Sequence, residues 1–234
     1  MTSSSVRRCL LSIVILLFVF CSTGCSFFLG TRVPAPSNSN VAIVGIAVKE
    51  KDTFDIPLRC GEVYFIKLDE TAPDDVMQGH ILSNTNYDEG YSYLINAQPG
   101  RYAAIGCIVR SRYVSLRIFF NKALVTRLTR TVNPGAVVVL GDITVDRTQT
   151  QIRAESQLDE VQRHYYKELV GKEVRQALED RRFLGHQFPL PQAGGSLDHE
   201  NPIDSALQRF LAVLSRNLPK AWEPWISNTA VPVL

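Results

Sequence analysis

The residues best suited to bind a ligand lie together in one polar stretch. The set combines amides, a carboxylate and aromatic rings: Asn84, Asn86, Tyr87, Asp88 and Tyr91. Aromatic rings stack on sugars, and amides or carboxylates bind hydroxyl and peptide groups, so this stretch predicts a site for a glycan or small ligand. The alternative interpretation is structural: a turn followed by a strand whose tyrosines face the core. The residue types leave both interpretations open.

A second polar stretch contains the side chains that a hydrolase would use. Ser196 lies near Asp198 and His199, which are the side-chain types of a hydrolytic group. The set His186, Asp198, His199 and Glu200 has the side-chain types of a metal or acid–base group. The spacing matches no catalytic motif, and the sequence has no phosphate-binding loop, nucleophile elbow or HExxH pattern. We therefore favour a solvated loop, and no catalytic residue is predicted.

Metal chemistry is not indicated either. Four acidic residues lie close together in a predicted loop: Asp69, Glu70, Asp74 and Asp75. They lack the spacing that wraps a calcium ion, and no Cys/His spacing suggests another metal. Neither a metal nor a cofactor is predicted.

An apolar run near the N-terminus is preceded by two arginines and followed by small residues. Arg7 and Arg8 come first, Cys9–Phe20 carries no charge, and Ser22-Thr23-Gly24-Cys25 follows. This order is typical of a secretory signal. The apolar core is shorter than the ~20 residues that a spanning helix needs, which favours a signal over a transmembrane anchor.

The last four residues, Ser22-Thr23-Gly24-Cys25, resemble the lipobox of bacterial lipoproteins. In that family a peptidase cuts before the cysteine, whose thiol carries a diacylglyceryl group. The resemblance implies that residues 1–24 are a signal peptide and that lipid on Cys25 anchors the chain to a membrane. Ser26 follows, not the Asp that marks inner-membrane retention in enteric members, so the resemblance implies the outer membrane, facing the periplasm or the cell surface.

Two cysteines remain beyond this segment. Cys60 and Cys107 each lie at or inside an apolar predicted strand. In an oxidising compartment they can form one disulfide, whereas free thiols would pack as small apolar side chains. Both states agree with the sequence, because a disulfide depends on a Cα separation that spacing along the chain does not give.

The net charge of the chain limits which classes of partner it can bind. The chain has 25 basic and 23 acidic residues, and removal of Arg7 and Arg8 with the signal makes the two equal. A neutral chain lacks the basic surface of a nucleic-acid binder, so no nucleic acid is predicted as a partner. The expected partners are the membrane, through the lipid on Cys25, and a protein of the envelope.

Beyond Cys25 the chain divides into three parts. Residues 25–40 are rich in Pro, Ser and Asn and predict a lipidated tether. Residues 41–147 contain about seven apolar or alternating runs separated by turns, Ala123–Val132 among them, which predict a mostly antiparallel β-sandwich domain. Residues 148–234 predict α-helices packed on that domain, so the expected fold class is α+β.

The turn at Pro99-Gly100 carries a second resemblance. The segment Tyr93–Tyr102 is similar to the strand–PG–x–Tyr–strand signature of carboxypeptidase-regulatory-like and transthyretin-like β-sandwiches. In those families the glycine turns the chain and the tyrosine enters the core. The resemblance implies a sandwich in which Tyr102 is buried and Gly100 has a backbone conformation that other residues resist.

Two helices are predicted in the C-terminal part. Apolar residues recur every three to five positions over Leu158–Leu178, with Ser156 as the N-terminal cap. Asn201 as cap and Pro202 at the first helical position begin a second helix. The segment Phe188–Glu200 is expected to join them as a Pro/Gly loop.

Three functions of different classes are compatible with these patterns. The favoured one is a membrane-anchored envelope lipoprotein that acts as a non-catalytic interaction or structural module. The second is a lipoprotein that binds a small ligand or glycan through the residues around Tyr87. The third is a hydrolase with an unrecognised site around Ser196 and His199.

Overall fold

The structure is a computed structural model of the 234-residue chain. It describes residues 33–51, 57–72, 75–110, 115–147, 158–179 and 192–229. Cys25 and the lipobox lie outside the described residues, as do His186 and Asp74. The described residues from Ala35 onward belong to one compact unit.

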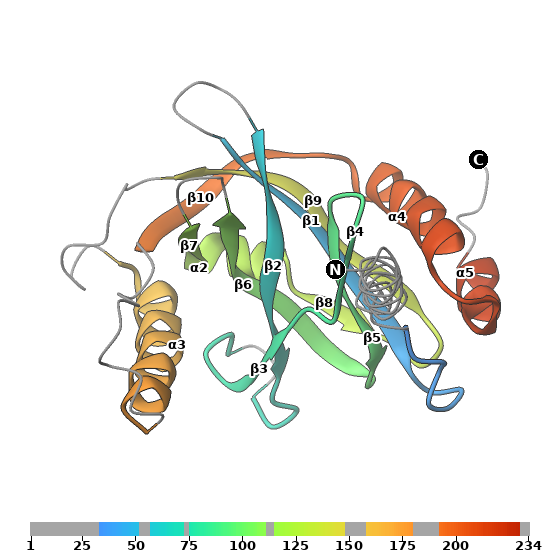
Figure 1. The fold of residues 1–234 in the computed structure, drawn as a ribbon, viewed down its shortest axis with the longest axis horizontal. Helices are drawn as coiled ribbons and strands as arrows, with labels where there is room; N and C mark the ends of the chain where they lie inside the picture. The colour runs from blue at the N-terminus through green and yellow to red at the C-terminus, as the bar shows by residue number, and fades with distance from the viewer. Residues whose placement is uncertain are drawn as a thin grey trace, which may run out of the picture. The chain divides into compact units, whose positions relative to one another are not determined.

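Six strands close into a barrel (Figure 1). In chain order they are β1 (Ala42–Lys51), β2 (Pro57–Leu68), β6 (Gly100–Arg110), β7 (Ser115–Phe120), β9 (Val137–Arg147) and β10 (Gln192–Glu200). Around the ring the order is β1, β2, β6, β7, β10 and β9. The β1–β9 and β7–β10 pairs are parallel, and the others are antiparallel.

Further strands extend this ring. Strand β3 (Gly79–Ser83) pairs with β2, and β8 (Arg130–Val132) pairs with the start of β6. Strand β5 (Tyr91–Ala97) pairs with the first half of β1 and forms a hairpin with β4 (Asn86–Asp88).

The predicted antiparallel β-sandwich is wrong, because the strands form a closed barrel. A sandwich has two separate sheets, whereas here the pairing of Lys49 with Arg59 joins β1 to β2 and completes the ring. The prediction failed at Phe188–Glu200, which was expected to be a loop. Its last nine residues form β10, and the backbone of Gly194 and Gly195 pairs with β7 despite the low strand propensity of glycine.

A second correction concerns Ala123–Val132, which was predicted as a strand. Residues Lys122–Arg127 form the short helix α2, and the strand β8 begins only at Arg130. Asn121 caps α2: its side-chain oxygen accepts a hydrogen bond from the Leu124 N–H at 2.9 Å. A local cap therefore decides the structure against the β-branched residues that follow.

The predicted turn at Pro99-Gly100 is present even though the sandwich is not. Tyr102 is 1% exposed, and its hydroxyl donates to the Gln98 carbonyl at 2.7 Å. Gly100 has φ +147, a conformation that L side chains rarely adopt. Both local expectations are confirmed, but here the turn connects the added strand β5 to the barrel strand β6 and does not require a sandwich.

Alternate residues of β1 belong to two separate cores. Ala42, Val44, Ile46 and Val48 join the large apolar cluster that includes residues of β2, β6 and β7. Gly45, with the opposite orientation in the strand, lies under helix α4. Both faces of β1 are buried, which explains its continuous apolar sequence.

Helix α4 (Ile203–Asn217) covers the outer face of β1, β5 and β9. The ring of Phe210 is stacked on Tyr91, with centroids 5.0 Å apart, and meets Tyr93 edge-on at 5.7 Å. A Cβ added to Gly45 would overlap the Phe210 ring, so the helix can approach this closely only because position 45 has no side chain. The short helices η4 (Lys220–Trp222) and α5 (Glu223–Asn228) follow.

The two long helices begin differently from the prediction. Pro202, not Asn201, is the cap residue of α4, and no side chain bonds to the first turn. Helix α3 (Glu160–Glu179) starts with a capping box in which Asp159 accepts from the Gln162 N–H at 2.8 Å and Gln162 accepts from the Asp159 N–H at 3.1 Å. Ser156, the predicted cap, lies outside the described residues.

Helix α3 packs beside β7 (Figure 1). The Gln162 amide donates to the Phe119 carbonyl at 2.9 Å, and the Tyr165 hydroxyl donates to the Val76 carbonyl at 2.6 Å. Val161 and Tyr165 are buried. The helix therefore joins the barrel through both apolar contacts and hydrogen bonds.

The space at Gly45 gives the first testable prediction. Gly45→Ala should lower the free energy of unfolding by about 1–3 kcal/mol, because the added methyl group displaces the Phe210 ring. Gly61→Ala is the matched control: this glycine is also in a strand, and nothing lies within 4 Å of its added Cβ. It should change stability by less than about 0.5 kcal/mol. Urea unfolding of both variants measures the difference, and equal midpoints would show that Phe210 is misplaced.

Candidate functional site

The residues predicted to bind a ligand lie in and just before the β4–β5 hairpin. The side chain of Asn84 is occupied by the backbone around it: it accepts from the Val63 N–H at 2.9 Å and donates to the carbonyls of Asn86 at 3.0 Å and Gly61 at 3.3 Å. These bonds fix the start of the hairpin to β2. Asn84 therefore has a structural role.

Two further members of this set also contact the protein itself. Tyr91 is 5% exposed and its hydroxyl donates to the Ala206 carbonyl at 3.2 Å, while Asp88 accepts a hydrogen bond from the Tyr93 hydroxyl. Burial raises the pKa of both tyrosines. Tyr87 is the aromatic of the set that remains exposed, at 40%. The structure brings the set together, but most of its polar groups support the fold, and ligand binding here stays a prediction.

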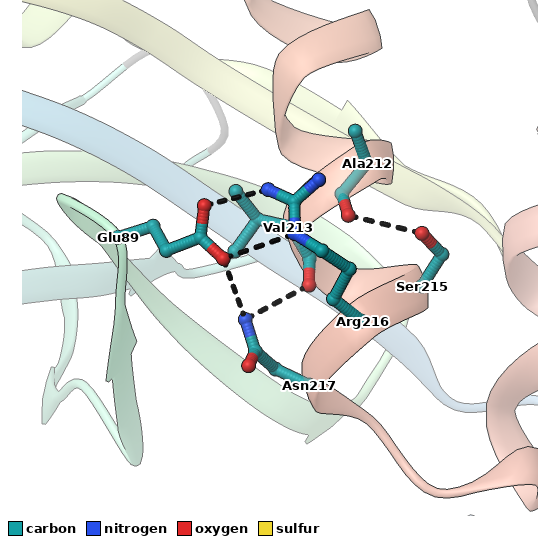
Figure 2. A network of polar contacts seen from close by, with 6 residues as sticks. All are labelled: Glu89, Ala212, Val213, Ser215, Arg216 and Asn217. Carbon is teal, nitrogen blue, oxygen red and sulfur yellow. Dashed lines mark hydrogen bonds and ion pairs between the residues drawn. The ribbon is translucent and has the colours of Figure 1, made fainter.

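The tip of this hairpin is attached to the end of α4 by an ion pair. Figure 2 shows the Glu89 carboxylate facing Arg216 and Asn217. Arg216 donates to it at 2.6 and 3.1 Å, and Asn217 at 3.3 Å. The hydrogen bond from Arg216 lowers the pKa of Glu89. These groups are exposed, so the pair positions the hairpin more than it stabilises the fold.

A buried carboxylate of the barrel wall also binds α4. Asp142 of β9 is 4% exposed and accepts from Arg209 at 2.7 Å, and Lys49 of β1 lies 3.5 Å away. The Asp142 carbonyl also accepts from the Asn201 N–H at 2.9 Å. Sequence reasoning missed this cluster, since its three charges come from segments far apart in the chain.

The residues considered for hydrolysis lie on β10. Ser196, Asp198 and His199 all belong to this one strand, and no hydrogen bond joins them in the part of the chain that the structure describes. Glu200 is engaged elsewhere, as the acceptor of a hydrogen bond from Arg127. His186 lies outside the described residues. Among these described residues of β10, no nucleophile is therefore hydrogen-bonded to a base.

The acidic loop residues form turns. Asp69 accepts from the Thr71 N–H at 2.9 Å and from its hydroxyl at 2.8 Å, and these two bonds lower the pKa of Asp69. Asp75 accepts from the Met77 N–H at 2.9 Å. Over the ranges that the structure describes, no group of three or more His, Cys, Asp or Glu side chains is placed to hold a metal ion.

Cys60 and Cys107 are joined by a disulfide between the paired strands β2 and β6, with Cα atoms 5.8 Å apart. Both are fully buried. This bond links two neighbouring strands of the barrel wall, so its role is structural.

The residues just before β1 are hydrogen-bonded to the end of β5. The side-chain amide of Asn96, at the end of β5, accepts from the Ser37 N–H at 2.7 Å and donates to the Ala35 carbonyl at 3.2 Å. Asn96 has φ +57, which asparagine tolerates better than most residues. The last part of the predicted tether is therefore fixed to the barrel.

The C-terminal helices η4 and α5 contact the residues just before β1 as well. The indole N–H of Trp225 donates to the Val41 carbonyl at 2.7 Å, and the same carbonyl accepts from the Gly135 N–H at 3.2 Å. Trp222 is fully buried, with its ring 5.3 Å from that of Trp225. These contacts hold η4 and α5 against the start of β1.

Strand register shows that all these groups lie at one end of the barrel. Ala42 pairs with Ala97, and Ile43 pairs with Val137, so β1 and β9 start where β5 ends. We call this the tether end, defined as residues 35–41, 96–100, 133–137 and 222–229. The pairs of Lys51 with Pro57 and of Arg110 with Ser115 mark the opposite end.

Comparison with known proteins gives no relative: no family model, curated protein or solved structure matches the chain. No helix in the described ranges has the length and apolar character to cross a membrane.

We call the two hydrogen bonds from Asn96 to Ser37 and Ala35 the Asn96 clamp. The clamp gives a prediction that concerns only the residues it holds. Asn96→Gly keeps the positive φ but removes both side-chain hydrogen bonds, so amide exchange at Ser37 should accelerate by about tenfold or more. The Asn40 N–H is an internal control, because it bonds to the Asn38 side chain at 2.8 Å within the same segment. Hydrogen exchange followed by NMR tests this, and an unchanged rate at Ser37 would contradict the clamp.

Proposed function

We propose that this protein is a lipid-anchored module of the bacterial cell envelope, without catalytic activity, that binds another envelope protein or serves a structural role. The observation that carries the proposal is the order of residues from Arg7 to Cys25: two cations, an uncharged apolar run, small residues and a cysteine. Each buried methylene of an acyl chain contributes about 0.8 kcal/mol, so several chains on Cys25 would hold the protein durably. Outer-membrane attachment follows from Ser26 after the cysteine.

The non-catalytic part of the proposal is supported by where the reactive side chains lie. The candidate residues of β10 share one extended strand, and those of the β4–β5 hairpin bond to the protein itself. What the described part of the chain does carry is a rigid, closed barrel with two helices fixed to its outside. Such a body suits a scaffold that presents a surface to a partner.

The anchor is tested by replacing the acceptor of the lipid. Cys25→Ala should abolish labelling with an alkyne palmitate analogue and leave an unprocessed precursor, because no thiol remains at the processing site. Cys21→Ala is the matched control, since it removes a thiol from the same segment and should leave labelling unchanged. Labelling that persists in Cys25→Ala would show that the lipobox assignment is wrong.

The absence of catalysis is tested separately with ester, amide and glycoside substrates. Purified protein is expected to give no turnover above that of buffer. Turnover that disappears in His199→Ala would instead place a hydrolytic site on β10 and overturn this part of the proposal.

A further inference from the structure

We propose that the tether end of the barrel lies against the lipid headgroups, so that the opposite end points away from the membrane. This inference rests on the proposed lipid anchor at Cys25. It concerns which surface of the protein remains open to a partner.

The first argument is the length of the chain between lipid and barrel. The predicted tether runs to Asn40, but the Asn96 clamp holds it from Ala35 onward. Ten residue steps separate Cys25 from Ala35, and even a fully extended chain of that length spans at most about 33–36 Å. A folded unit of this size has a radius of gyration of about 16 Å and is roughly 40 Å across. The maximum reach of the tether is thus less than the width of the body, so the opposite end cannot be turned against the bilayer while Cys25 is anchored in it.

The second argument is the chemistry of the tether end. Trp225 is half-buried, its indole N–H is bound by Val41, and its ring is supported by Trp222. Tryptophan favours the headgroup region because it combines an apolar ring with a polar group. A rigidly held, partly exposed indole at the end where the tether arrives is well placed to contact headgroups.

The third argument concerns charge. The described charged side chains at or beside the tether end have both signs: Lys67, Arg101, Arg130 and Lys220 against Asp69, Glu70 and Glu223. No strong field of one sign repels this surface from anionic headgroups or holds it there. The short tether, which keeps the local concentration of lipid high, therefore sets the orientation.

The test uses the full-length lipidated protein in vesicles of phosphatidylethanolamine and phosphatidylglycerol that contain a photoactivatable headgroup lipid. After irradiation, mass spectrometry locates the lipid adducts. Peptides of the tether end, residues 133–137 and 220–229, should carry several-fold more adduct than peptides of the opposite end, residues 57–63 and 105–110. Equal labelling of both ends, or more at the opposite end, would overturn the inference.

Two variants test whether the short tether is the cause. Insertion of about thirty Gly and Ser residues after Gly30 adds a flexible segment with an r.m.s. span of roughly 27–33 Å and should bring the labelling ratio close to one. Asn96→Gly, which frees only the segment that the clamp holds, should lower the ratio by a smaller amount. A ratio unchanged in the lengthened variant would overturn the claim that tether length sets the orientation.

Flotation with the vesicles is measured before irradiation and separates the two proposals. Protein that does not float has no lipid anchor, and the proposed function fails. Protein that floats but shows no difference between the two ends retains the anchor, and only the inference about orientation fails.

Discussion

The pairing of β1 with three other strands is the constraint on which the rest of the structure depends. Along its whole length β1 pairs with β9, its first half also pairs with β5, and its last residues, Lys49–Lys51, pair with β2. The last pairing closes the barrel, and the β5 pairing widens the outer face on which α4 lies. One strand thus belongs both to the interior core and to the seat of the helix, which requires both of its faces to be buried. Gly45 is the position where this requirement is tightest.

The same strand connects the described residues of the predicted tether to the fold. Val41, just before β1, receives hydrogen bonds from Trp225 and Gly135, and Asn96 of the neighbouring strand holds the residues that precede it. Force on the N-terminal side would therefore reach a segment that is bonded to three other parts of the chain. If Cys25 carries lipid as proposed, this arrangement would transfer the restraint of the lipid to the barrel.

Local features of the fold could be predicted from the sequence, but the closure of the barrel could not. The burial of Tyr102 and the conformation of Gly100 follow from a turn of a few residues, and the helix over Leu158–Leu178 follows from its apolar period. Strand β10 did not follow, because its glycines oppose strand structure locally and only the gap between β7 and β9 makes pairing favourable. Without β10, the strand-forming runs of residues 41–147 match the sequence pattern of a sandwich. Parallel pairing of β1 with β9 is also invisible in the period of either strand.

The candidate sites show the same limit. The polar residues around Tyr87 were visible as a group, yet their partners, such as Ala206 and Arg216, come from a helix more than a hundred residues away. The role of Asn96 could not be predicted, because a single asparagine before a Pro-Gly turn is common. Its role depends on residues 35–37 lying beside it in the fold. Residue types indicate which groups can bond, whereas the fold decides which of them are already satisfied.

Closure of the ring also bears on the proposed attachment to a membrane. Anchoring raises the local concentration of identical chains, and unpaired strand edges are then sites of wrong association. Each of the six barrel strands has neighbours on both sides, so the outermost strands of the described sheet are β3, β4 and β8, which are five, three and three residues long. Strands this short offer few backbone groups for pairing with another chain. A closed barrel with short outer strands is therefore compatible with dense attachment to a membrane, and contacts with a partner would then depend on side-chain surfaces and not on open sheet edges.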